Sequence, residues 1–597
     1  MSERAPSLPR TTHTLTVRYS GGEERRGPVT MGQANMIRCM LRDEPAHINI
    51  HDVWPVPEGT RTDAALDALR ALVVRHEALR TTFPHAPGSA PAEQVVASKG
   101  EFTVTVVDHT PEDFSGDLAP HAEYAESLAR QARVHRFRLD RDFALRVSLI
   151  TVDGAPFFVA LAASHALTDV SALSVLKEEW LSLLAGEELP PLTSLAPLDL
   201  AAEEATPAGL RRSEASLRHW ARIIRTGPQA MFAEPGAEGT ETRVPRLTLR
   251  SRRAARALAL AAERTGGLPS TVLLTAWCAL VAHRAGQTAC VAAVPTSNRY
   301  HPRLARSVNT VSQDALLSLD LRVDSFDALL RKAWGAALNA YRHSQFDALG
   351  LWEMIDRTTF ERGSRFARDV VFNDVSTLPS TVADAAVAPT SDTESESEGG
   401  ADGPELELSW GPEQVLPTRV LTFVYETDPV VHLATWADPA LFRRDEAEDF
   451  LTGLVRLLEA TATADVPMTS LTEVTGVRPA RRGPEWRRVD GSWVSPPLVA
   501  ETLGKALRGL PVHVVADAPD ENGNTPALTA FVAAGDAPLT PAEAHTALMD
   551  ALPGHPGVLA PRRYVIVQDP PSEAGRSSAW LRQQILVEGT GRDRDVT

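Results

Sequence analysis

The sequence predicts an α/β protein built from two lobes, each a mixture of strands and helices. Apolar residues recur at helical spacing in some segments and form strand-like runs in others. Both kinds of segment occur in the first half of the chain and again in the second half. In addition, 597 residues exceed what a single hydrophobic core supports, so about two to four domains are expected.

The first half predicts three helices and three strands. Leu66, Leu69 and Val73 recur at helical spacing, whereas polar and apolar residues alternate after Phe102, as in a strand. Asp153-Gly154 is typical of a tight hairpin turn, so the apolar runs on either side of it are expected to pair. The expected helices are 66–83, 121–137 and 171–186, and the expected strands are 102–110, 144–152 and 155–164.

The second half repeats this mixture of elements. One segment is apolar all round and predicts a buried helix, and two others are amphipathic and predict helices with one face in the core. The expected helices are 271–286, 325–343 and 443–460, and the expected strands are 289–297, 368–376 and 420–426.

Composition narrows the class of protein. A formal net charge of −17 argues against general binding to nucleic acid or to anionic membranes. Cys39, Cys278 and Cys290 are odd in number and far apart, which favours buried thiols in a reducing compartment over disulfides or a metal site. The first 27 residues lack the apolar core of a signal peptide, and the run at 271–283 is too short to cross a bilayer. We therefore expect a cytoplasmic protein without a nucleic-acid, membrane or metal partner.

Two changes in composition mark boundaries along the chain. Residues 376–406 include the acidic stretch SDTESESEGGADG and few large apolar residues, which predicts a disordered insertion. Pro, Gly and Arg cluster within 476–488, which we expect to be a linker. Residues 489–597 are then expected to form a separate small module.

Six short segments follow one another in a characteristic order. In this order they resemble the motifs of the condensation domains of nonribosomal peptide synthetases, a family that includes free-standing members. RHEALRTTF matches the family pattern RHExLRTxF completely, and SHALTDV is similar to HHxxxDG. The resemblance covers about residues 28–475. The segments are RHEALRTTF, RFRLDRDFALRVSL, SHALTDV, PTSNRYHPRLARSVNT, AYRHSQFDAL and FARDVVFND.

The resemblance implies a particular fold and particular partners. It implies two lobes like chloramphenicol acetyltransferase in a V-shaped pseudo-dimer, at 28–190 and 191–475, after an N-terminal segment at 1–27. In the family, acyl groups arrive on the 4′-phosphopantetheine arms of acyl or peptidyl carrier proteins. We therefore expect a monomer that binds no cofactor directly and takes its phosphopantetheine-bound substrate from a carrier protein.

His165 is the residue that the resemblance identifies as catalytic. It matches the second His of the family motif, and a neutral imidazole near pH 7 is suited to take a proton from an attacking amine or hydroxyl. It is expected to act as general base, to orient the nucleophile or to stabilise the intermediate. Taken without the other motifs, it would be an ordinary His at the end of a strand.

Asp169 and Arg299 are expected to support the loop that carries His165. From the residues alone, Asp169 is a plausible cap for a helix that starts near Ser171. The resemblance instead implies an ion pair between Asp169 and Arg299, which lies in SNR where the family often has SGR. The alternative is a simple helix cap and a surface Arg.

Two positions depart from the family pattern, and two others are expected to support or border the channel. Ser164 replaces the first His of the motif, and Val170 replaces its Gly, so either the loop is locally ordinary or the channel is narrower. Arg80 is expected to support the groove. Asn373, in VFND, is expected to border it, with an ordinary edge-strand residue as the alternative.

The module at 489–597 is similar in layout to the small C-terminal subdomain of adenylate-forming enzymes. The family has a catalytic Lys after a Gly near the end, and this chain has Gly575-Arg576. Because an Arg fork does not simply replace a Lys point charge, we expect a degenerate module without adenylation activity.

The expected function is transfer of a carrier-bound acyl thioester to an amine or hydroxyl, giving an amide or an ester in natural-product biosynthesis. One alternative is a non-catalytic platform that recruits carrier proteins, and another is an acyltransferase that uses coenzyme A thioesters. Retention of His165 favours the enzyme. The acceptor, either a small molecule or a carrier-bound group, is not identified by the sequence.

Overall fold

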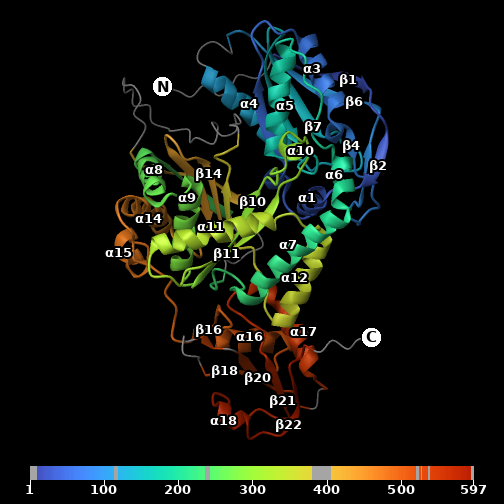
Figure 1. Ribbon diagram of the computed structural model, residues 1–597. Helices are drawn as coiled ribbons and strands as arrows, with labels where there is room; N and C mark the ends of the chain where they lie inside the picture. The colour runs from blue at the N-terminus through green and yellow to red at the C-terminus, as the bar shows by residue number, and fades with distance from the viewer. Residues whose placement is uncertain are drawn as a thin grey trace.

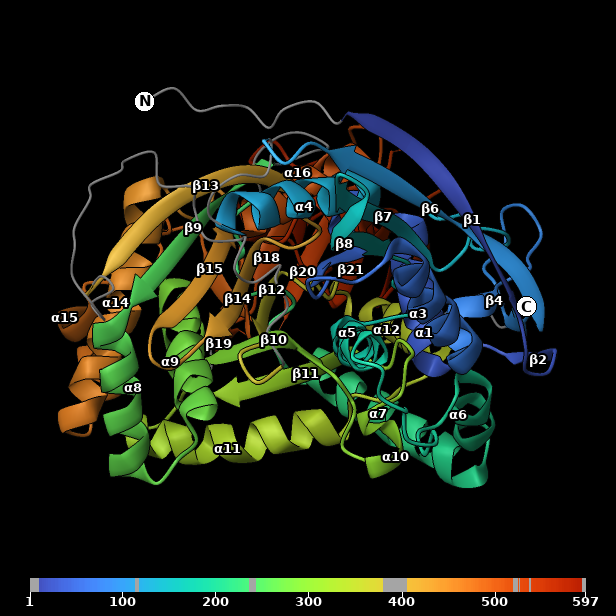
Figure 2. The same cartoon turned by 90° about the horizontal axis from the view of Figure 1, so that it is seen from above.

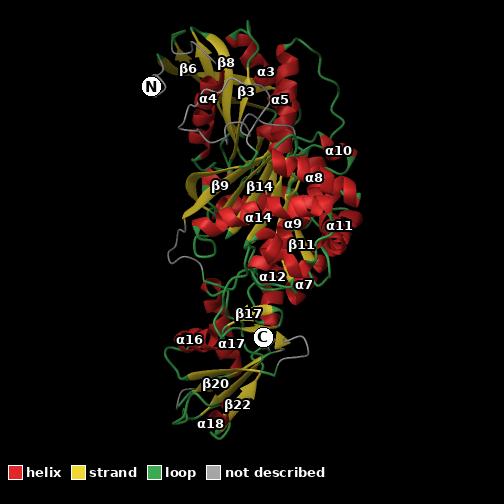
Figure 3. Cartoon of the chain, turned by 90° about the vertical axis from the view of Figure 1, so that its left-hand side faces the viewer, coloured by secondary structure: helices red, strands yellow, loops and turns green. Residues whose placement is uncertain are grey.

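The computed structural model shows three bodies stacked along the molecule (Figure 1). The first lobe lies at one end, the second lobe in the middle and the C-terminal module at the other end (Figure 3). Most of the insertion expected at 376–406 lies outside the described residues. The structure describes residues 10–112, 118–235, 243–378, 405–518, 524–525, 527–535 and 538–592.

The first lobe is a five-stranded sheet with helices on both faces. Its strand order is β1-β6-β7-β8-β3, and β6 and β7 are its parallel pair. Helices α1, α3 and α5 share one apolar core with the sheet, and α4 packs on the opposite face. The elements are β1 (Thr11–Ser20), α1 (Met31–Arg42), α2 (Pro45–Ile48), β3 (Ile50–Pro55), α3 (Thr62–Arg75), β6 (Lys99–His109), α4 (Leu118–Arg133), β7 (Leu145–Val152), β8 (Ala155–Ala163) and α5 (Val170–Leu184).

The expected N-terminal segment contributes a strand to the first lobe, and one expected helix is too long. Within that segment, β1 pairs with β6 along ten positions and forms one edge of the sheet. A second small sheet joins β2 (Arg25–Pro28), β5 (Glu93–Val96) and β4 (Thr81–Thr82). The helix expected at 66–83 ends at Arg75 and is followed by a single 3₁₀ turn, Glu77–Arg80, because the chain must turn into β4.

The second lobe contains a seven-stranded sheet in the order β11-β10-β12-β14-β15-β9-β13. Helices α8, α9, α11 and α14 cover one face and build the largest apolar core. The other face turns toward the first lobe and α4 (Figure 2). The elements are β9 (Arg243–Ser251), α8 (Arg252–Thr265), α9 (Pro269–Arg284), β10 (Ala289–Thr296), α10 (Pro302–Ala305), β11 (Gln313–Asp320), α11 (Phe326–Arg342), α12 (Ala348–Arg362), β12 (Val370–Asp374), β13 (Glu407–Val415), β14 (Val420–Glu426), β15 (Val431–Ala437), α14 (Arg444–Thr463) and α15 (Leu471–Thr475).

The strands and helices expected in the second half are confirmed to within a few residues. The predicted helix at 271–286 is α9, and eleven of its residues are buried, as its lack of a polar face requires. Two further helices, α6 (Pro197–Glu204) and α7 (Pro207–Thr226), connect the lobes. Within α6, Asp199 pairs with Arg25 of the first lobe at 2.6 Å.

The C-terminal module has its own core and is docked on the second lobe. Its main sheet has the order β18-β20-β21-β22, with α16 and α17 in the same apolar core. Gln229 of the second lobe donates hydrogen bonds from Nε2 to the carbonyls of Pro556 (2.7 Å) and Val558 (2.8 Å). The elements are β16 (Arg487–Val489), β17 (Ser492–Val494), α16 (Pro496–Ala506), β18 (Val512–Ala516), β19 (Asn524–Thr525), β20 (Leu528–Ala533), α17 (Pro541–Ala551), β21 (Arg563–Val567), α18 (Ser577–Trp580) and β22 (Ile585–Gly589).

Arg592 fastens the end of the described chain to the end of α12. Its guanidinium donates to the backbone carbonyls of Glu361 (2.9 Å) and Arg362 (3.3 Å), and also to that of Pro561 (2.8 Å). These first two acceptors belong to the last turn of a helix, where carbonyls lack intrahelical donors. The module therefore completes an element of the second lobe.

Among the described residues, no single helix has both the length and the apolar composition needed to cross a membrane. Helices α8 and α9 taken together have that length and apolar composition, but they meet at an angle of 103°.

Gly32, near the start of α1, makes a close contact between the lobes. A Cβ built there would overlap the carbonyl oxygen of Thr310, in the loop before β11. That oxygen belongs to the backbone and cannot rotate away, so any larger residue must push the lobes apart.

Gly32→Ala is expected to destabilise the protein by about 1–3 kcal/mol, the usual cost of forcing an extra atom into close packing. The measurement is urea unfolding followed by circular dichroism. Gly335→Ala is the matched control, because nothing lies within 4 Å of its Cβ position and it is inside α11. This second change is expected to stabilise by about 0.5–1 kcal/mol through helix propensity. Equal effects at both sites would contradict the contact.

Candidate active site

The loop Ser164–Asp169 leaves the end of β8 and leads into α5. β8 is almost wholly buried, so the chain must turn sharply where the strand ends. The Ser164 carbonyl accepts hydrogen bonds from the backbone N–H groups of Leu167 (3.0 Å) and Thr168 (3.1 Å). These bonds close a tight turn that includes His165.

One ring nitrogen of His165 forms a hydrogen bond, and the other has no hydrogen-bond partner among the described residues. Nδ1 donates to the Thr168 carbonyl at 2.8 Å, because a carbonyl can only accept. The proton is thus fixed on Nδ1, and the lone pair lies on Nε2. Burial lowers the pKa of His165, against the opposing effect of the Asp169 charge. The ring is therefore neutral near pH 7, the state that a general base needs.

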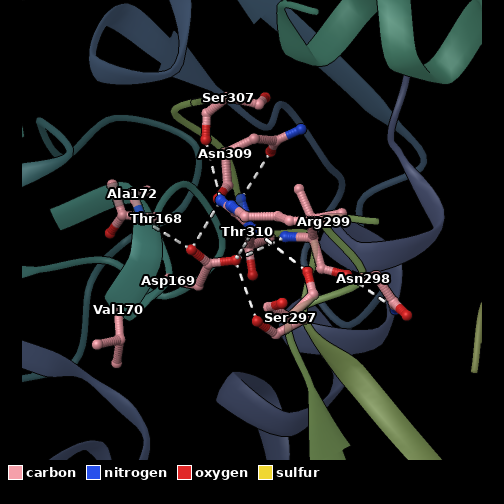
Figure 4. A network of polar contacts seen from close by, with 12 residues as sticks. Thr168, Asp169, Val170, Ala172, Ser297, Asn298, Arg299, Ser307, Asn309 and Thr310 are labelled. Atoms are coloured by element: carbon pink, nitrogen blue, oxygen red, sulfur yellow. Dashed lines mark hydrogen bonds and ion pairs between the residues drawn. The ribbon is translucent and has the colours of Figure 1, made fainter. Parts of the chain in front are cut away.

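The predicted ion pair between Asp169 and Arg299 is present. Arg299 donates from both terminal nitrogens to the two carboxylate oxygens of Asp169, at 2.8 and 2.9 Å (Figure 4). The side chains are 7% and 2% exposed, so the pair is buried. Because Asp169 follows β8 and Arg299 follows β10, this contact joins the two lobes.

Asp169 is also the helix cap that its sequence position indicated. Its Oδ1 accepts from the N–H of Ala172 at 2.9 Å in the first turn of α5. Its Oδ2 accepts from the N–H of Val311 (3.0 Å) and from the hydroxyl of Ser312 (3.1 Å). Asp169 therefore forms both the predicted cap and the predicted ion pair, and the alternative of a surface Arg299 is wrong because Arg299 is buried.

Asn298 shapes the loop that presents Arg299, a role that the sequence analysis missed. Its φ is +54°, in the left-handed region where Asn is among the better tolerated residues after Gly. Its Oδ1 accepts from the Ser344 hydroxyl at 2.5 Å, and its Nδ2 donates to the Val311 carbonyl at 3.2 Å. The presence of Asn where the family often has Gly was the available signal.

Val170 and Ser164, which depart from the family motif, are accommodated differently in the structure. Val170 is the first residue of α5 and does not have a positive φ, so the loop is ordinary at this position. The Ser164 hydroxyl is buried and has no hydrogen-bond partner among the described residues. Ser164 therefore contributes its backbone carbonyl to the turn, and its hydroxyl makes no hydrogen bond with His165.

Among the described residues, neither Arg80 nor Asn373 forms a hydrogen bond with His165, Asp169 or Arg299. Arg80 is buried in the first lobe and donates to the backbone carbonyls of Ala97 (2.6 Å) and Glu23 (3.4 Å). Asn373 is half-buried on β12, opposite Phe423 in the parallel ladder. The structure thus brings His165, Asp169 and Arg299 together, and a role of Arg80 or Asn373 at the groove stays a prediction.

Comparison with known proteins gives concordant results. The family model described as Condensation domain matches residues 28–466. Tyrocidine synthase 3 of Brevibacillus parabrevis is 25% identical over 348 residues, which is 56% of this chain and 5% of that synthase. The structure of SgcC5 from Streptomyces globisporus has a TM-score of 0.55 and 19% identity, covering 74% of this chain and 100% of that one. The X-domain from teicoplanin biosynthesis has a TM-score of 0.56 and 18% identity, covering 76% of this chain and 98% of that one.

The fold defines the class of protein. Two α/β lobes, in contact through the loop that carries His165, form a pseudo-dimer with the fold of chloramphenicol acetyltransferase. Because the family model covers most of its length, the chain belongs to the condensation domain family. Its curated relatives are nonribosomal peptide synthetases, which supports a condensation role in peptide natural-product biosynthesis.

Arg299→Ala is expected to destabilise the protein by about 3–5 kcal/mol, because it leaves the Asp169 carboxylate buried and unpaired. The measurement is urea unfolding at neutral pH. Arg70→Ala is the matched control, since its pair with Asp67 is about half exposed on both sides and is expected to be worth less than about 1 kcal/mol. If both variants lose the same stability, the pair does not have this structural role.

Proposed function

We propose that this chain transfers an acyl group from a carrier-protein thioester to an amine or a hydroxyl. The observation that supports this most directly is the state of His165, with Nδ1–H fixed by the Thr168 carbonyl and Nε2 left with its lone pair. Neither Asp169 nor Arg299 is available for proton transfer, because each is occupied by the other. His165 is therefore the proposed catalytic residue of the loop.

The proposed reaction proceeds through a tetrahedral intermediate. The amine or hydroxyl attacks the thioester carbonyl carbon while Nε2 of His165 takes its proton, so the new C–N or C–O bond forms without a charged nucleophile. When the intermediate collapses, the C–S bond breaks and the imidazolium returns the proton to the departing thiolate. A positioned base of this kind contributes about 10²–10⁴-fold, and the two lobes supply proximity in addition.

The thioester in this proposal is carried by 4′-phosphopantetheine on a partner acyl or peptidyl carrier protein, so the chain itself needs no bound cofactor. The C-terminal module is proposed to stabilise the second lobe. Support comes from its docking contacts and from Arg576, which pairs with Glu573 on the surface at 3.0 Å. No adenylation step is assigned to it.

A non-catalytic platform is the second candidate, and one observation favours it. The buried Ser164 hydroxyl has no partner among the described residues, so the position of the first motif His gives His165 no side-chain support. A structural neighbour is the X-domain, which was solved in complex with OxyB. Assays must therefore distinguish catalysis from recruitment.

The test is intact-mass spectrometry of acyl-loaded carrier proteins incubated with a panel of amines and alcohols. His165→Ala is expected to lower the rate of product formation by about 10²–10⁴-fold while leaving the fold intact. His13→Ala is the matched control, because His13 is exposed on β1. Acyl-coenzyme A is run in parallel to test the coenzyme A alternative. Product formation unaffected by His165→Ala would exclude the general-base role, and carrier binding without any product would favour the platform.

The protonation state of His165 gives an independent prediction. Burial lowers the pKa of His165 in the folded protein, whereas a His in the unfolded chain titrates at about 6.5. The unfolded chain therefore binds this proton more readily. Below about pH 6.5, His165 therefore reduces stability, and this penalty is absent at higher pH. NMR titration of His-labelled protein, with His165→Ala to assign the signal, is expected to give a pKa below 6.5. A value above 6.5 would contradict the buried neutral ring.

A further inference from the structure

The second lobe contains an apolar cavity of about 210 Å³ between α14 and the sheet. It lies on the face of the sheet that α14 covers, because Leu247 and Val420 belong to the same core as that helix. The residues turned toward the first lobe form another cluster, which includes Trp436. The sheet itself thus separates the cavity from the face that is turned toward the first lobe. Its apolar walls include Leu247, Trp410, Val420, Phe442, Ala447 and Phe450.

The cavity opens to the surface beside Glu413 and Arg444, and it is much larger than the gaps usual in a close-packed core. Most voids in native cores are no larger than a water molecule. An engineered apolar cavity of about 150 Å³ stays dry and binds benzene, so this larger cavity has room for a six-membered ring with a short substituent. Trp410, Phe442 and Phe450 provide aromatic walls, which favour a flat or bulky apolar group.

The backbone of β13 is irregular at the mouth of the cavity. The register between β13 and β9 shifts between Gly411 and Glu413, which marks a bulge, and Glu413 lies opposite Pro245. Proline has no N–H to donate to the ladder, so the sheet edge is held less tightly here. Bulges re-aim side chains and are frequent beside functional sites. Here the bulge brings Glu413 into the cavity lining.

Two opposite charges at the mouth have no ionic partner among the described residues. Arg443 is occupied, because it pairs with Asp445 at 2.7 Å. Arg444 instead lies over the Trp410 ring, 5.0 Å from its centroid, with no carboxylate within ion-pair distance in the described part of the chain. Glu413 is exposed and likewise has no such cation within the described ranges. The apolar cavity is therefore bordered by one available cation and one available anion.

We propose that this cavity binds an α-amino acid with an aromatic or large aliphatic side chain. The side chain fills the apolar cavity, the α-carboxylate pairs with Arg444 and the α-ammonium pairs with Glu413. A fatty acid would use Arg444 alone, and an apolar amine would use Glu413 alone. The site is distinct from His165, so the bound amino acid is a separate ligand that is not positioned for acyl transfer.

Isothermal titration calorimetry of the full chain with four probes tests the proposal. L-phenylalanine is expected to bind at one site per chain. 3-Phenylpropionate lacks the ammonium and phenethylamine lacks the carboxylate, and each is expected to bind about three- to tenfold more weakly. L-alanine lacks the ring and is expected to show no binding in the same range.

Variants locate the site on the protein. Arg444→Gln and Glu413→Gln lie on the surface and are each expected to weaken L-phenylalanine binding about three- to tenfold. Arg331→Gln and Glu353→Gln are the matched controls, since both residues are exposed on other helices. Ala447→Phe fills the cavity and is expected to abolish binding, with circular dichroism to verify folding.

The proposal is overturned if L-phenylalanine does not bind, or if it binds no better than the two probes that lack one charge. It is also overturned if binding survives both surface substitutions unchanged. None of these results bears on acyl transfer, which is assayed separately through His165. A failure of the amino-acid site and a failure of the proposed function are therefore distinguishable.

Discussion

The buried pair between Asp169 and Arg299 is the constraint on which the arrangement of the two lobes depends. A carboxylate removed from water is costly unless every lone pair finds a donor, and Asp169 receives donors from both lobes. The same carboxylate caps α5 and accepts a hydrogen bond from the backbone of Val311, in the loop just before β11. His165, four residues earlier, is consequently positioned by groups of the second lobe as well as by its own strand.

The loop separates two roles that a His and an Asp often share. In many catalytic sites a carboxylate orients the imidazole, whereas here the orienting group is the backbone carbonyl of Thr168. A neutral acceptor fixes the tautomer, and the effect of burial on the pKa of His165 outweighs that of the nearby Asp169 charge. Asp169 serves as the structural anchor of the loop.

The sequence allowed prediction of the second-lobe elements and of the ion pair, because both depend on local pattern or on a motif. It did not indicate that β1 joins the first lobe, since residues 11–20 are mostly exposed and pair with a strand almost ninety residues later. The left-handed conformation of Asn298 also depends on a distant neighbour, because its Oδ1 accepts from the hydroxyl of Ser344. Such contacts are set by tertiary packing, which periodicity does not report.

The contact of Arg592 with the end of α12 has a consequence for synthesis on the ribosome. The Arg362 carbonyl receives this donor from a residue 230 positions later in the chain. While the intervening residues are being translated, the last turn of α12 must rely on water or fray. Because α12 packs on α7 and contacts α1, the nascent second lobe is expected to complete its folding only after the C-terminal module has left the ribosome.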